Sequence, residues 1–272
     1  MVQSTHAGRF ADLAGDLHGG TASWAPIVLL HGLSFDRRMW TPVITALTET
    51  PGRIVLALDL PGHGESPDWP SYELDHVAAA VHNAVAAARL EAPVVVGHSI
   101  GAVIATIYAA RYPARGVVNV DQPLRVGPFA SLVQSQADAL RGPDFPAVWE
   151  LFASSMHPEL LSNEARQIVE TTSRPRQAVV LGYWADVMTS APEELEQRVA
   201  AGLSTLRARG TPYLVVTGSP LAAGEQQWLR LQLPQARFVI VSGSGHFPHL
   251  ADPHGVAHEV LESVDAPSER TR

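Results

Sequence analysis

Short apolar runs alternate along the chain with longer stretches in which apolar positions recur every three or four residues. The runs are typical of strands buried on both faces of a parallel sheet, and the spaced positions are typical of covering helices. In Leu74–Leu90, for example, the apolar residues follow one helical stripe. The alternation predicts an α/β fold with a mostly parallel central sheet flanked by helices. Strands are expected at residues 26–30, 53–60, 94–96, 116–120, 213–217 and 238–241.

The alternation stops between residues 122 and 200, where the pattern is helical throughout. Breaks that contain proline separate the expected helices, which cover residues 132–140, 146–156, 163–171, 177–188 and 193–207. We interpret this segment as a helical cap inserted over one end of the sheet. The chain is therefore expected to consist of a core domain, residues 1–121 and 201–272, and a cap, residues 122–200. The last core helix is expected to begin at Asp252-Pro253, an N-cap followed by proline.

Composition narrows the classes of function. With 272 residues and 46% hydrophobic content, the chain is long enough to bury one large core. The net charge of −8, from 27 acidic and 19 basic residues without a long basic run, argues against a nucleic-acid or anionic-membrane partner. Cysteine is absent, which excludes disulfides, thiolate metal sites and cysteine nucleophiles.

The sequence also bears on location and assembly. No run reaches the roughly 18 apolar residues of a membrane span, and Met1–Arg9 lacks the apolar core of a secretory signal. A cytoplasmic enzyme is the expectation. The residues imply neither a metal nor an organic cofactor, and they leave the oligomeric state open, a homodimer included.

The most informative motif is Gly97–Gly101, which reads GHSIG and joins an apolar run to a helix of small residues. This context is typical of a nucleophile elbow, a sharp strand-to-helix turn that presents a serine above a sheet. Flanking glycines fit such a turn because its strained backbone leaves little room for side chains. Ser99 is therefore the candidate nucleophile, beside a helix N-terminus that favours developing negative charge.

Four motifs, in order along the chain, resemble those of the α/β-hydrolase superfamily. They are His31-Gly32, Asp59–Ser66 (DLPGHGES), Gly97–Gly101 and Gly243–Pro248 (GSGHFP). The resemblance implies the α/β-hydrolase fold, with the cap as its variable part. It also implies that His246 is the base that takes the proton of Ser99. The oxyanion hole would then come from the backbone N–H groups of Leu33 and Ile100.

The acid departs from the commonest family pattern. Most members carry an aspartate shortly after the strand expected at residues 213–217, but this slot holds Leu221 and the segment 218–224 contains no carboxylate. A carboxylate is still needed to hold the histidine in its productive tautomer. Some branches place it after the strand that follows the elbow helix, where this chain has Asp121. Asp121 is therefore the expected acid, with Glu225 as the alternative.

The cap is expected to decide what enters the site. Its aromatic and flexible apolar residues suit a hydrophobic substrate, although each is equally well explained as part of the cap's own core. They are Trp149, Phe152, Met156, Tyr183, Trp184 and Met188. The sequence resembles zearalenone lactone hydrolases in its acid position and its His-Phe-Pro turn, and because those enzymes contact substrate with a cap tryptophan, Trp184 is the preferred pocket residue. Gly32 and Ser34 are further candidate substrate contacts, and Ser34 is also explained as the start of the next loop.

These inferences favour a serine hydrolase that cleaves a carboxylic ester through an acyl-enzyme. The expected partner is a small hydrophobic ester or lactone, including a macrocyclic lactone such as zearalenone. Serine at the elbow argues against dehalogenation and epoxide opening, since similar branches need an aspartate nucleophile there. Two alternatives remain: a carbon–carbon bond hydrolase of ring-cleavage products, against which Leu221 counts, and a non-catalytic small-molecule receptor on the same fold.

Overall fold

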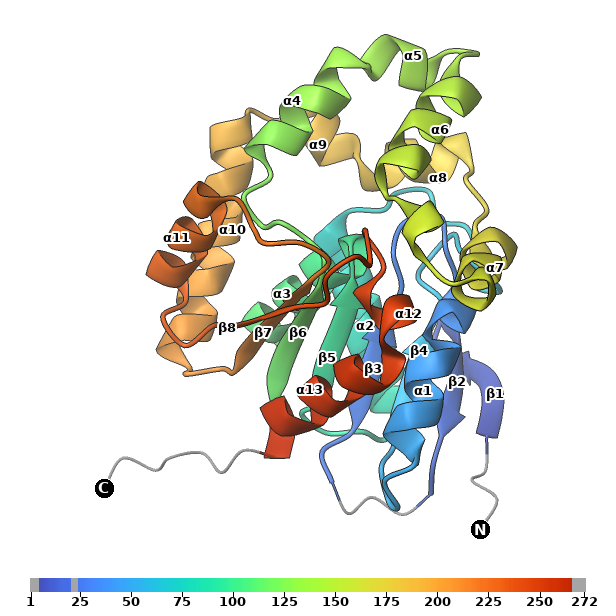
Figure 1. Ribbon diagram of the computed structural model, residues 1–272, viewed down its shortest axis with the longest axis vertical. Helices are drawn as coiled ribbons and strands as arrows, with labels where there is room; N and C mark the ends of the chain where they lie inside the picture. The colour runs from blue at the N-terminus through green and yellow to red at the C-terminus, as the bar shows by residue number, and fades with distance from the viewer. Residues whose placement is uncertain (1–4, 21–23, 266–272) are drawn as a thin grey trace.

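The central sheet has eight strands in the order β1-β2-β4-β3-β5-β6-β7-β8 (Figure 1). The computed structural model describes residues 5–20 and 24–265. Strands β3 to β8 pair in parallel, whereas β1 and β2 form an antiparallel hairpin that joins the sheet antiparallel to β4. The strands are β1 Thr5–Phe10, β2 Leu13–His18, β3 Ile27–Leu30, β4 Val55–Leu58, β5 Val94–His98, β6 Gly116–Val120, β7 Tyr213–Thr217 and β8 Arg237–Ile240.

The parallel strands confirm the strands expected from the apolar runs. Every residue of β3, β4, β5, β6 and β7 is buried, because helices cover both faces of this part of the sheet. The antiparallel hairpin was not predicted from the sequence. Most of β1 is exposed, and β2 carries the polar residues Asp16 and His18, so neither strand has the continuous apolar pattern of a buried one.

Two hydrophobic clusters hold helices to the opposite faces of the sheet. On one face, α2 (Leu74–Ala87) packs against α3 (Ile100–Arg111), and α3 packs against α10 (Pro192–Ala208). On the other face, α1 (Thr41–Thr48) packs against α13 (Pro253–Asp265). The start of α13 is as expected, since Asp252 Oδ1 accepts a hydrogen bond from Gly255 N at 2.9 Å. The described residues contain no helix long and apolar enough to cross a bilayer.

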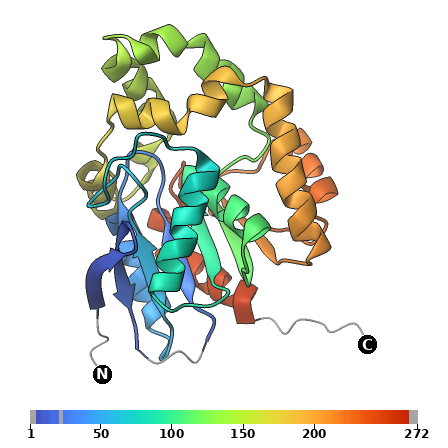
Figure 2. The same cartoon turned by 180° about the vertical axis from the view of Figure 1, so that it is seen from behind.

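The helices between β6 and α10 lie beyond the carboxyl ends of the parallel strands and are called the cap below, whereas α10 runs back along the core (Figures 1 and 2). The helices of the cap are α4 Gly127–Ser135, α5 Ala137–Arg141, α6 Phe145–Ser155, α7 Asn163–Thr172, α8 Gln177–Tyr183 and α9 Ala185–Thr189. Short 3-10 turns occur at Arg37–Trp40 and Pro158–Leu160, and α7 packs against the first of them. The remaining helices are α11 Ala223–Gln232 and α12 Pro248–Ala251.

Two expected cap helices are divided in the structure. The helix expected at residues 132–140 breaks at Gln136, and the one expected at 177–188 breaks at Trp184. Both residues have φ near −100° and ψ near 0° (Gln136 −105°, 9°; Trp184 −95°, 6°), which turns the axis. Helix α10 spans residue 200 without a break and packs against the core helix α3. The domain boundary expected at that residue stays a prediction.

Candidate active site

Ser99 lies at the sharp turn between β5 and α3, with φ 53° and ψ −125°. This left-handed conformation is unfavourable for a residue with a side chain. It is stabilised by a hydrogen bond of 3.0 Å from Ser99 N to Val120 O. The two motif glycines are required by close contacts, because a Cβ on Gly97 would lie 2.1 Å from Gly101 O and one on Gly101 would lie 2.5 Å from Leu30 O. The local geometry is that of a nucleophile elbow.

His246 and Asp121 form a hydrogen-bonded pair at the same end of the sheet. His246 Nδ1 lies 2.7 Å from Asp121 Oδ2, and both side chains are about one-fifth exposed. The other carboxylate oxygen, Asp121 Oδ1, accepts a hydrogen bond of 2.8 Å from Gly218 N. Since a carboxylate only accepts, Nδ1 carries a proton and Nε2 is left to accept one from a hydroxyl.

The backbone around Asp121 is fixed by its neighbours. Asp121 follows β6 with φ 54°, and its N–H donates to Val216 O at 2.8 Å. Asn119 closes the same turn, because its side chain accepts from Gln122 N at 3.0 Å and donates to Gln122 O at 2.8 Å. These contacts direct the carboxylate toward the histidine.

The alternative acid, Glu225, is occupied elsewhere. Its Oε1 accepts hydrogen bonds from Leu124 N at 3.0 Å and Arg125 N at 3.2 Å, in the chain that leaves the sheet after β6. Burial raises the pKa of Glu225. The hydrogen bonds of the described residues do not include one between Glu225 and His246, so the geometry favours Asp121.

Ser99 and His246 are brought to one place without a direct hydrogen bond between them in the described part of the chain. Ser99 is partly exposed, and the ring of the preceding residue, His98, has its centroid 4.6 Å from that of His246. Catalytic hydrogen bonds in empty sites are often long and tighten when substrate binds. The arrangement is therefore compatible with proton transfer from the Ser99 hydroxyl to His246 Nε2.

The expected oxyanion amides lie at the ends of β3 and β5. In the described residues, neither Leu33 N nor Ile100 N has a hydrogen-bond acceptor. Gly32 lies directly against the elbow, because a Cβ there would be 3.3 Å from Ser99 Cβ. Ser34 has φ 69° and is 2% exposed. Two free amides beside the serine are what an oxyanion hole requires.

Two neutral histidines hold the turn after β3 in place. His31 Nε2 accepts from Leu60 N at 2.9 Å, and His63 Nε2 accepts from Ser34 N at 3.0 Å. Each ring therefore donates through Nδ1, to Gly32 O and Pro61 O respectively. Burial lowers the pKa of His31 to about 4 and that of His63 to about 3, which keeps both rings uncharged and able to accept.

The cap residues expected to contact substrate fall into two groups. Trp184 is 7% exposed and lies against an aromatic cluster, with ring centroids 5.4 Å from Phe129, 5.2 Å from Phe152 and 6.0 Å from Trp149. Tyr183 instead joins the cap to the core, since its hydroxyl donates to Pro61 O at 2.9 Å and burial raises its pKa well above the usual value. Trp184 and Trp149 are buried in the hydrophobic cluster of the cap, so their contact with a substrate stays a prediction.

Met156 approaches the site through its backbone. Its carbonyl accepts a hydrogen bond of 2.9 Å from His246 N, at the end of α6. Ser34 makes a second backbone link to the cap, since its carbonyl accepts from Arg174 N at 2.7 Å.

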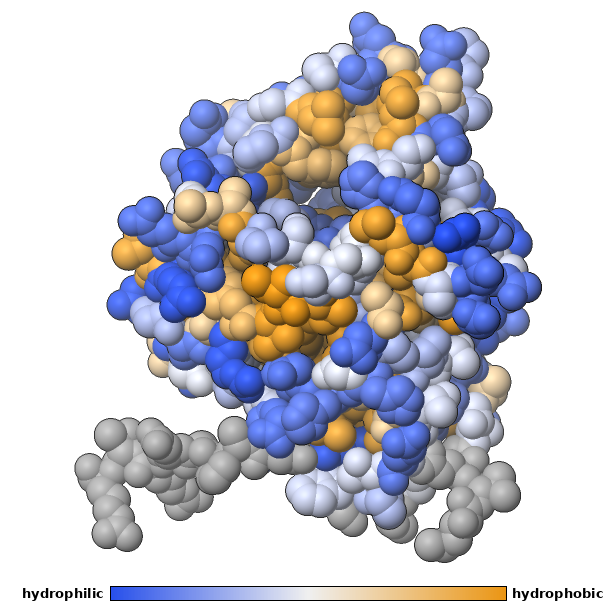
Figure 3. Space-filling view, viewed as in Figure 1, coloured by the Kyte–Doolittle hydropathy of each residue, from blue (hydrophilic) through white to orange (hydrophobic). Residues whose placement is uncertain are grey.

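Figure 3 shows the molecule hollowed between the cap and the core, with apolar side chains gathered on the cap above the hollow.

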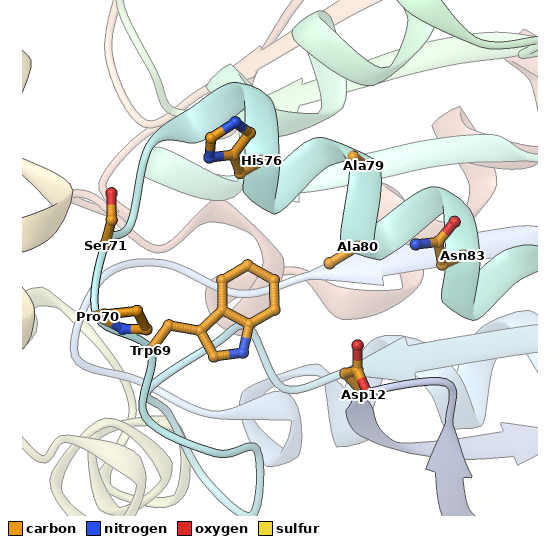
Figure 4. Close-up of a pocket in the computed structure, with 8 residues that line it drawn as sticks. All are labelled: Asp12, Trp69, Pro70, Ser71, His76, Ala79, Ala80 and Asn83. Atoms are coloured by element: carbon orange, nitrogen blue, oxygen red, sulfur yellow. The ribbon is translucent and has the colours of Figure 1, made fainter.

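A separate surface pocket of about 360 Å³ lies beside α2, away from these residues (Figure 4). The indole of Trp69 lies between α2 and the β1–β2 turn there. Its lining residues are Asp12, Trp69, Pro70, Ser71, His76, Ala79, Ala80 and Asn83, and no expected site residue is among them. No group of three or more His, Asp and Glu side chains in the described ranges is arranged to hold a metal ion.

Some contacts of the site had no signal in the sequence. Three contacts each involve a main-chain atom: the bond from Gly218 N to Asp121, the bond from His246 N to Met156 O, and the contact of His98 Nε2 with His246 O at 2.8 Å. Any residue type provides such atoms, so only the folded chain identifies them. The sequence pointed to Gly218 only indirectly. Because residues 218–224 contain no carboxylate, Asp121 was left as the acid, and Gly218 N donates to that acid.

Comparison with known proteins extends these observations. The sequence profile described as "Alpha/beta hydrolase family" matches residues 27–259. The chain is 33% identical over 135 residues to an sn-1-specific diacylglycerol lipase of Xenopus tropicalis, a match that covers 49% of this chain and 41% of the relative. It is 28% identical over 256 residues to a pimeloyl-[acyl-carrier protein] methyl ester esterase of Nitrosomonas europaea, covering 86% and 93%.

A solved structure supports the fold independently. The structure of a haloalkane dehalogenase variant from Agrobacterium tumefaciens superimposes with a TM-score of 0.74 at 21% identity, covering 96% of each chain. At this identity the likeness concerns the fold alone.

Proposed function

The chain belongs to the alpha/beta hydrolase family, and on this premise we propose that it is a serine hydrolase that cleaves a carboxylic ester, a cyclic ester included. The observation that carries the proposal is the hydrogen bond of 2.7 Å between His246 Nδ1 and Asp121 Oδ2, beside an elbow serine. A histidine oriented by a carboxylate next to a serine hydroxyl is the arrangement that activates a weak nucleophile.

In the proposed reaction, His246 Nε2 takes the proton of Ser99 Oγ as that oxygen attacks the substrate carbonyl carbon. Asp121 keeps the ring in the Nδ1–H tautomer and stabilises the imidazolium. The imidazolium then gives its proton to the departing alkoxide, which leaves an ester between the acyl group and Ser99. Water repeats both steps on this acyl-enzyme and releases the acid.

The amides of Leu33 and Ile100 are proposed to hold the carbonyl oxygen when it becomes an oxyanion. Each such donor is worth about 3 kcal/mol in the transition state. The hydrogen bond from Ser34 N to His63 supports this role, because it fixes the peptide beside Leu33 before substrate arrives. Preorganised donors stabilise developing charge without the cost of reorganisation.

The substrate is proposed to be a small hydrophobic ester or lactone. The aromatic cluster around Trp184 and Trp149 supports an apolar substrate, and Gly32, Ser34, Tyr183 and Met156 remain proposed contacts or supports of the pocket. A lactone such as zearalenone is among the proposed substrates. We also propose that the protein is cytoplasmic and binds neither nucleic acid nor membranes. The matched relatives include an esterase and a lipase by name, which supports ester chemistry in general.

The direct test is turnover of a substrate panel by the wild type and by Ser99→Ala. The panel contains three linear esters (p-nitrophenyl acetate, butyrate and octanoate) and two lactones (γ-butyrolactone and zearalenone). It also contains a hydroxylated dienone carboxylate of the kind that ring cleavage produces. Glu225→Gln is the matched control, because it neutralises a half-buried carboxylate that does not contact His246. Ester or lactone cleavage that Ser99→Ala abolishes and Glu225→Gln retains is the expected result.

The panel also separates the alternatives. Preference for zearalenone over linear esters would identify a lactonase, and preference for the dienone would favour carbon–carbon hydrolysis. A wild type that turns over nothing but binds one of these compounds tightly would replace the proposal by a receptor on the same fold.

A further inference from the structure

His98 immediately precedes Ser99 and is fully buried at the end of β5. Its Nε2 lies 2.8 Å from the carbonyl oxygen of His246. Since a carbonyl oxygen only accepts, Nε2 carries the proton and donates it, and Nδ1 is left with its lone pair. The residue beside the nucleophile is thus bonded to the main chain of the expected base.

The opposite edge of the same ring faces the turn Gly32–Ser34, called the oxyanion turn below. A Cβ built on Gly32 would lie 2.7 Å from His98 Nδ1, so only glycine fits there. Within the described residues, Nδ1 has no hydrogen-bond partner. The imidazole therefore lies between two segments that the sequence separates widely, the oxyanion turn and the loop Gly243–Phe247, called the histidine loop below.

The ring remains uncharged in this position. Burial, followed by the nearby rings of His249 and His246, holds the pKa of His98 well below its usual value. The groups packed around it are His246, His249, Phe247 and Phe35, with ring centroids between 4.5 and 6.3 Å away. A neutral ring keeps its donor and adds no second positive charge when His246 takes up a proton.

We propose that His98 is a positioning residue for the reaction, acting through His246. Its Nε2–H fixes the backbone of His246, and its ring sets the separation between the elbow, the oxyanion turn and the histidine loop. The inference rests on the proposed function, because the position of His246 matters for catalysis only if His246 serves Ser99.

His249 provides the contrast that separates positioning from packing. It is equally buried and its ring lies 4.5 Å from that of His98, but neither of its nitrogens has a hydrogen-bond partner among the described residues. If His98 only filled space, replacing either histidine by an apolar residue of similar size would have similar effects. If His98 positions the base, only its own replacement reduces catalysis.

The experiment compares His98→Met, His98→Gln and His249→Met. Methionine fills a similar volume without a donor, and the Gln amide N–H places a donor near the position of Nε2. With p-nitrophenyl butyrate, His98→Met is expected to lower kcat by roughly 10- to 100-fold with KM changed less than about twofold, as small misplacements of a catalytic group do. His98→Gln is expected to recover most of that loss, and His249→Met to stay within about threefold of the wild type.

A second readout does not depend on substrate. The proton that His246 Nδ1 donates to Asp121 is expected to give a downfield ¹H NMR signal, which should shift or disappear in His98→Met and persist in His98→Gln and His249→Met. Far-UV circular dichroism establishes that each variant is folded. If the wild type is inactive but the NMR signal changes only in His98→Met, the proposed function is wrong, and the claim that His98 positions His246 still holds.

Two outcomes would overturn the inference. One is a folded His98→Met protein with wild-type kcat and an unchanged NMR signal. The other is an equal loss of kcat in His98→Met and His249→Met without rescue by His98→Gln, which would reduce both residues to packing.

Discussion

Ser34, Ser99 and Asp121 share an unfavourable backbone conformation, with φ of 69°, 53° and 54°. Each such residue costs on the order of 1–3 kcal/mol and persists only where its surroundings determine it. The carbonyls of Val120 and Val216, at the ends of neighbouring strands, accept the N–H groups of Ser99 and Asp121. These three residues follow the carboxyl ends of β3, β5 and β6, where sheets of this kind bind ligands.

The role of Asp121 gives the first prediction. Asp121→Asn should lower kcat by about 10³- to 10⁴-fold, because an amide in place of Oδ2 stabilises the wrong tautomer of His246 and cannot stabilise its imidazolium. KM should change little, since the hydrogen-bond partners of the Asp121 carboxylate are His246 and Gly218 and not the substrate. Steady-state kinetics on the best ester of the panel measures both constants.

The matched control for this prediction is Glu225→Gln. Its carboxylate accepts from two backbone amides but not from His246, so kcat should stay within about threefold of the wild type. Near-normal turnover of Asp121→Asn together with loss in Glu225→Gln would reverse the assignment of the acid.

The sequence was informative about residues whose type matters. Ser99 was predicted from a motif, and Asp121 from its position together with the missing carboxylate at Leu221; the structure brings Asp121 to His246. It was uninformative about His98, whose partner is a carbonyl 148 positions away. A main-chain partner leaves no trace in the identity of the residue that provides it.

At the scale of elements, the cap contacts the histidine loop where one glycine allows it. A Cβ on Gly245 would lie 2.6 Å from Met156 O and 2.9 Å from His157 O, and Gly245 has φ 54°. The same cap segment accepts the hydrogen bond of His246 N. The position of the cap is therefore linked to that of the expected base.

Gly245→Ala should lower kcat by about 10²-fold, because the added methyl group forces the cap segment and the histidine loop apart. Gly243→Ala is the matched control, since Gly243 has φ 75° in the same turn but its Cβ would meet nothing within 4 Å. Both variants should lose about 1–2 kcal/mol of stability from the left-handed conformation. Equal kcat losses in the two variants would mean that backbone strain, not the cap contact, is responsible.

The aromatic cluster of the cap gives a prediction about specificity. If Trp184 borders the substrate, Trp184→Ala should raise KM for p-nitrophenyl octanoate by roughly 10- to 150-fold and leave KM for the acetate nearly unchanged. The range corresponds to about 1.5–3 kcal/mol of lost apolar contact. If the cluster with Trp149 and Phe152 is only the cap's core, both KM values stay constant while thermal unfolding shifts downward. Kinetics on the two esters, with a melting curve, separates these results.

Elements with continuous apolar runs were predictable, and mixed ones were not. Strands β3 to β7 are buried on both faces, and their sequences have the corresponding uniform pattern. The β1–β2 hairpin covers only an edge of the sheet and mixes polar with apolar residues. The breaks at Gln136 and Trp184 separate helices that contact different neighbours, since α4 packs against α9 whereas α5 packs against α6 and α8. A local helical pattern does not reveal such contacts.

For the whole molecule, buried uncharged histidines link stability to pH. Burial lowers the pKa of His31 to about 4 and of His63 and His249 to about 3, and it holds that of His98 well below its usual value. In the unfolded chain each of these groups titrates near 6.5. The native state therefore binds fewer protons than the unfolded state between about pH 4 and 6.5.

The sign of the effect follows from that difference. A group whose pKa is lowered on folding leaves the native state fully stable above the unfolded pKa and destabilises it as the pH falls below 6.5. Each of the four histidines contributes up to about 1.4 kcal/mol per pH unit in this window. The free energy of unfolding, measured by urea denaturation, should fall steeply from pH 7 to pH 5.

His63→Gln tests this account because glutamine has no proton to gain and its side-chain oxygen is able to accept from Ser34 N in place of His63 Nε2. Its loss of unfolding free energy between pH 7 and pH 5 should be smaller than that of the wild type, by up to about 2 kcal/mol. The exposed His76 serves as control, and His76→Gln should retain the wild-type difference. An unchanged difference in His63→Gln would mean that His63 does not contribute to the acid sensitivity. Because His31 and His63 also hold the oxyanion turn, any ester hydrolysis by the wild type should be lost no later than its fold as the pH is lowered.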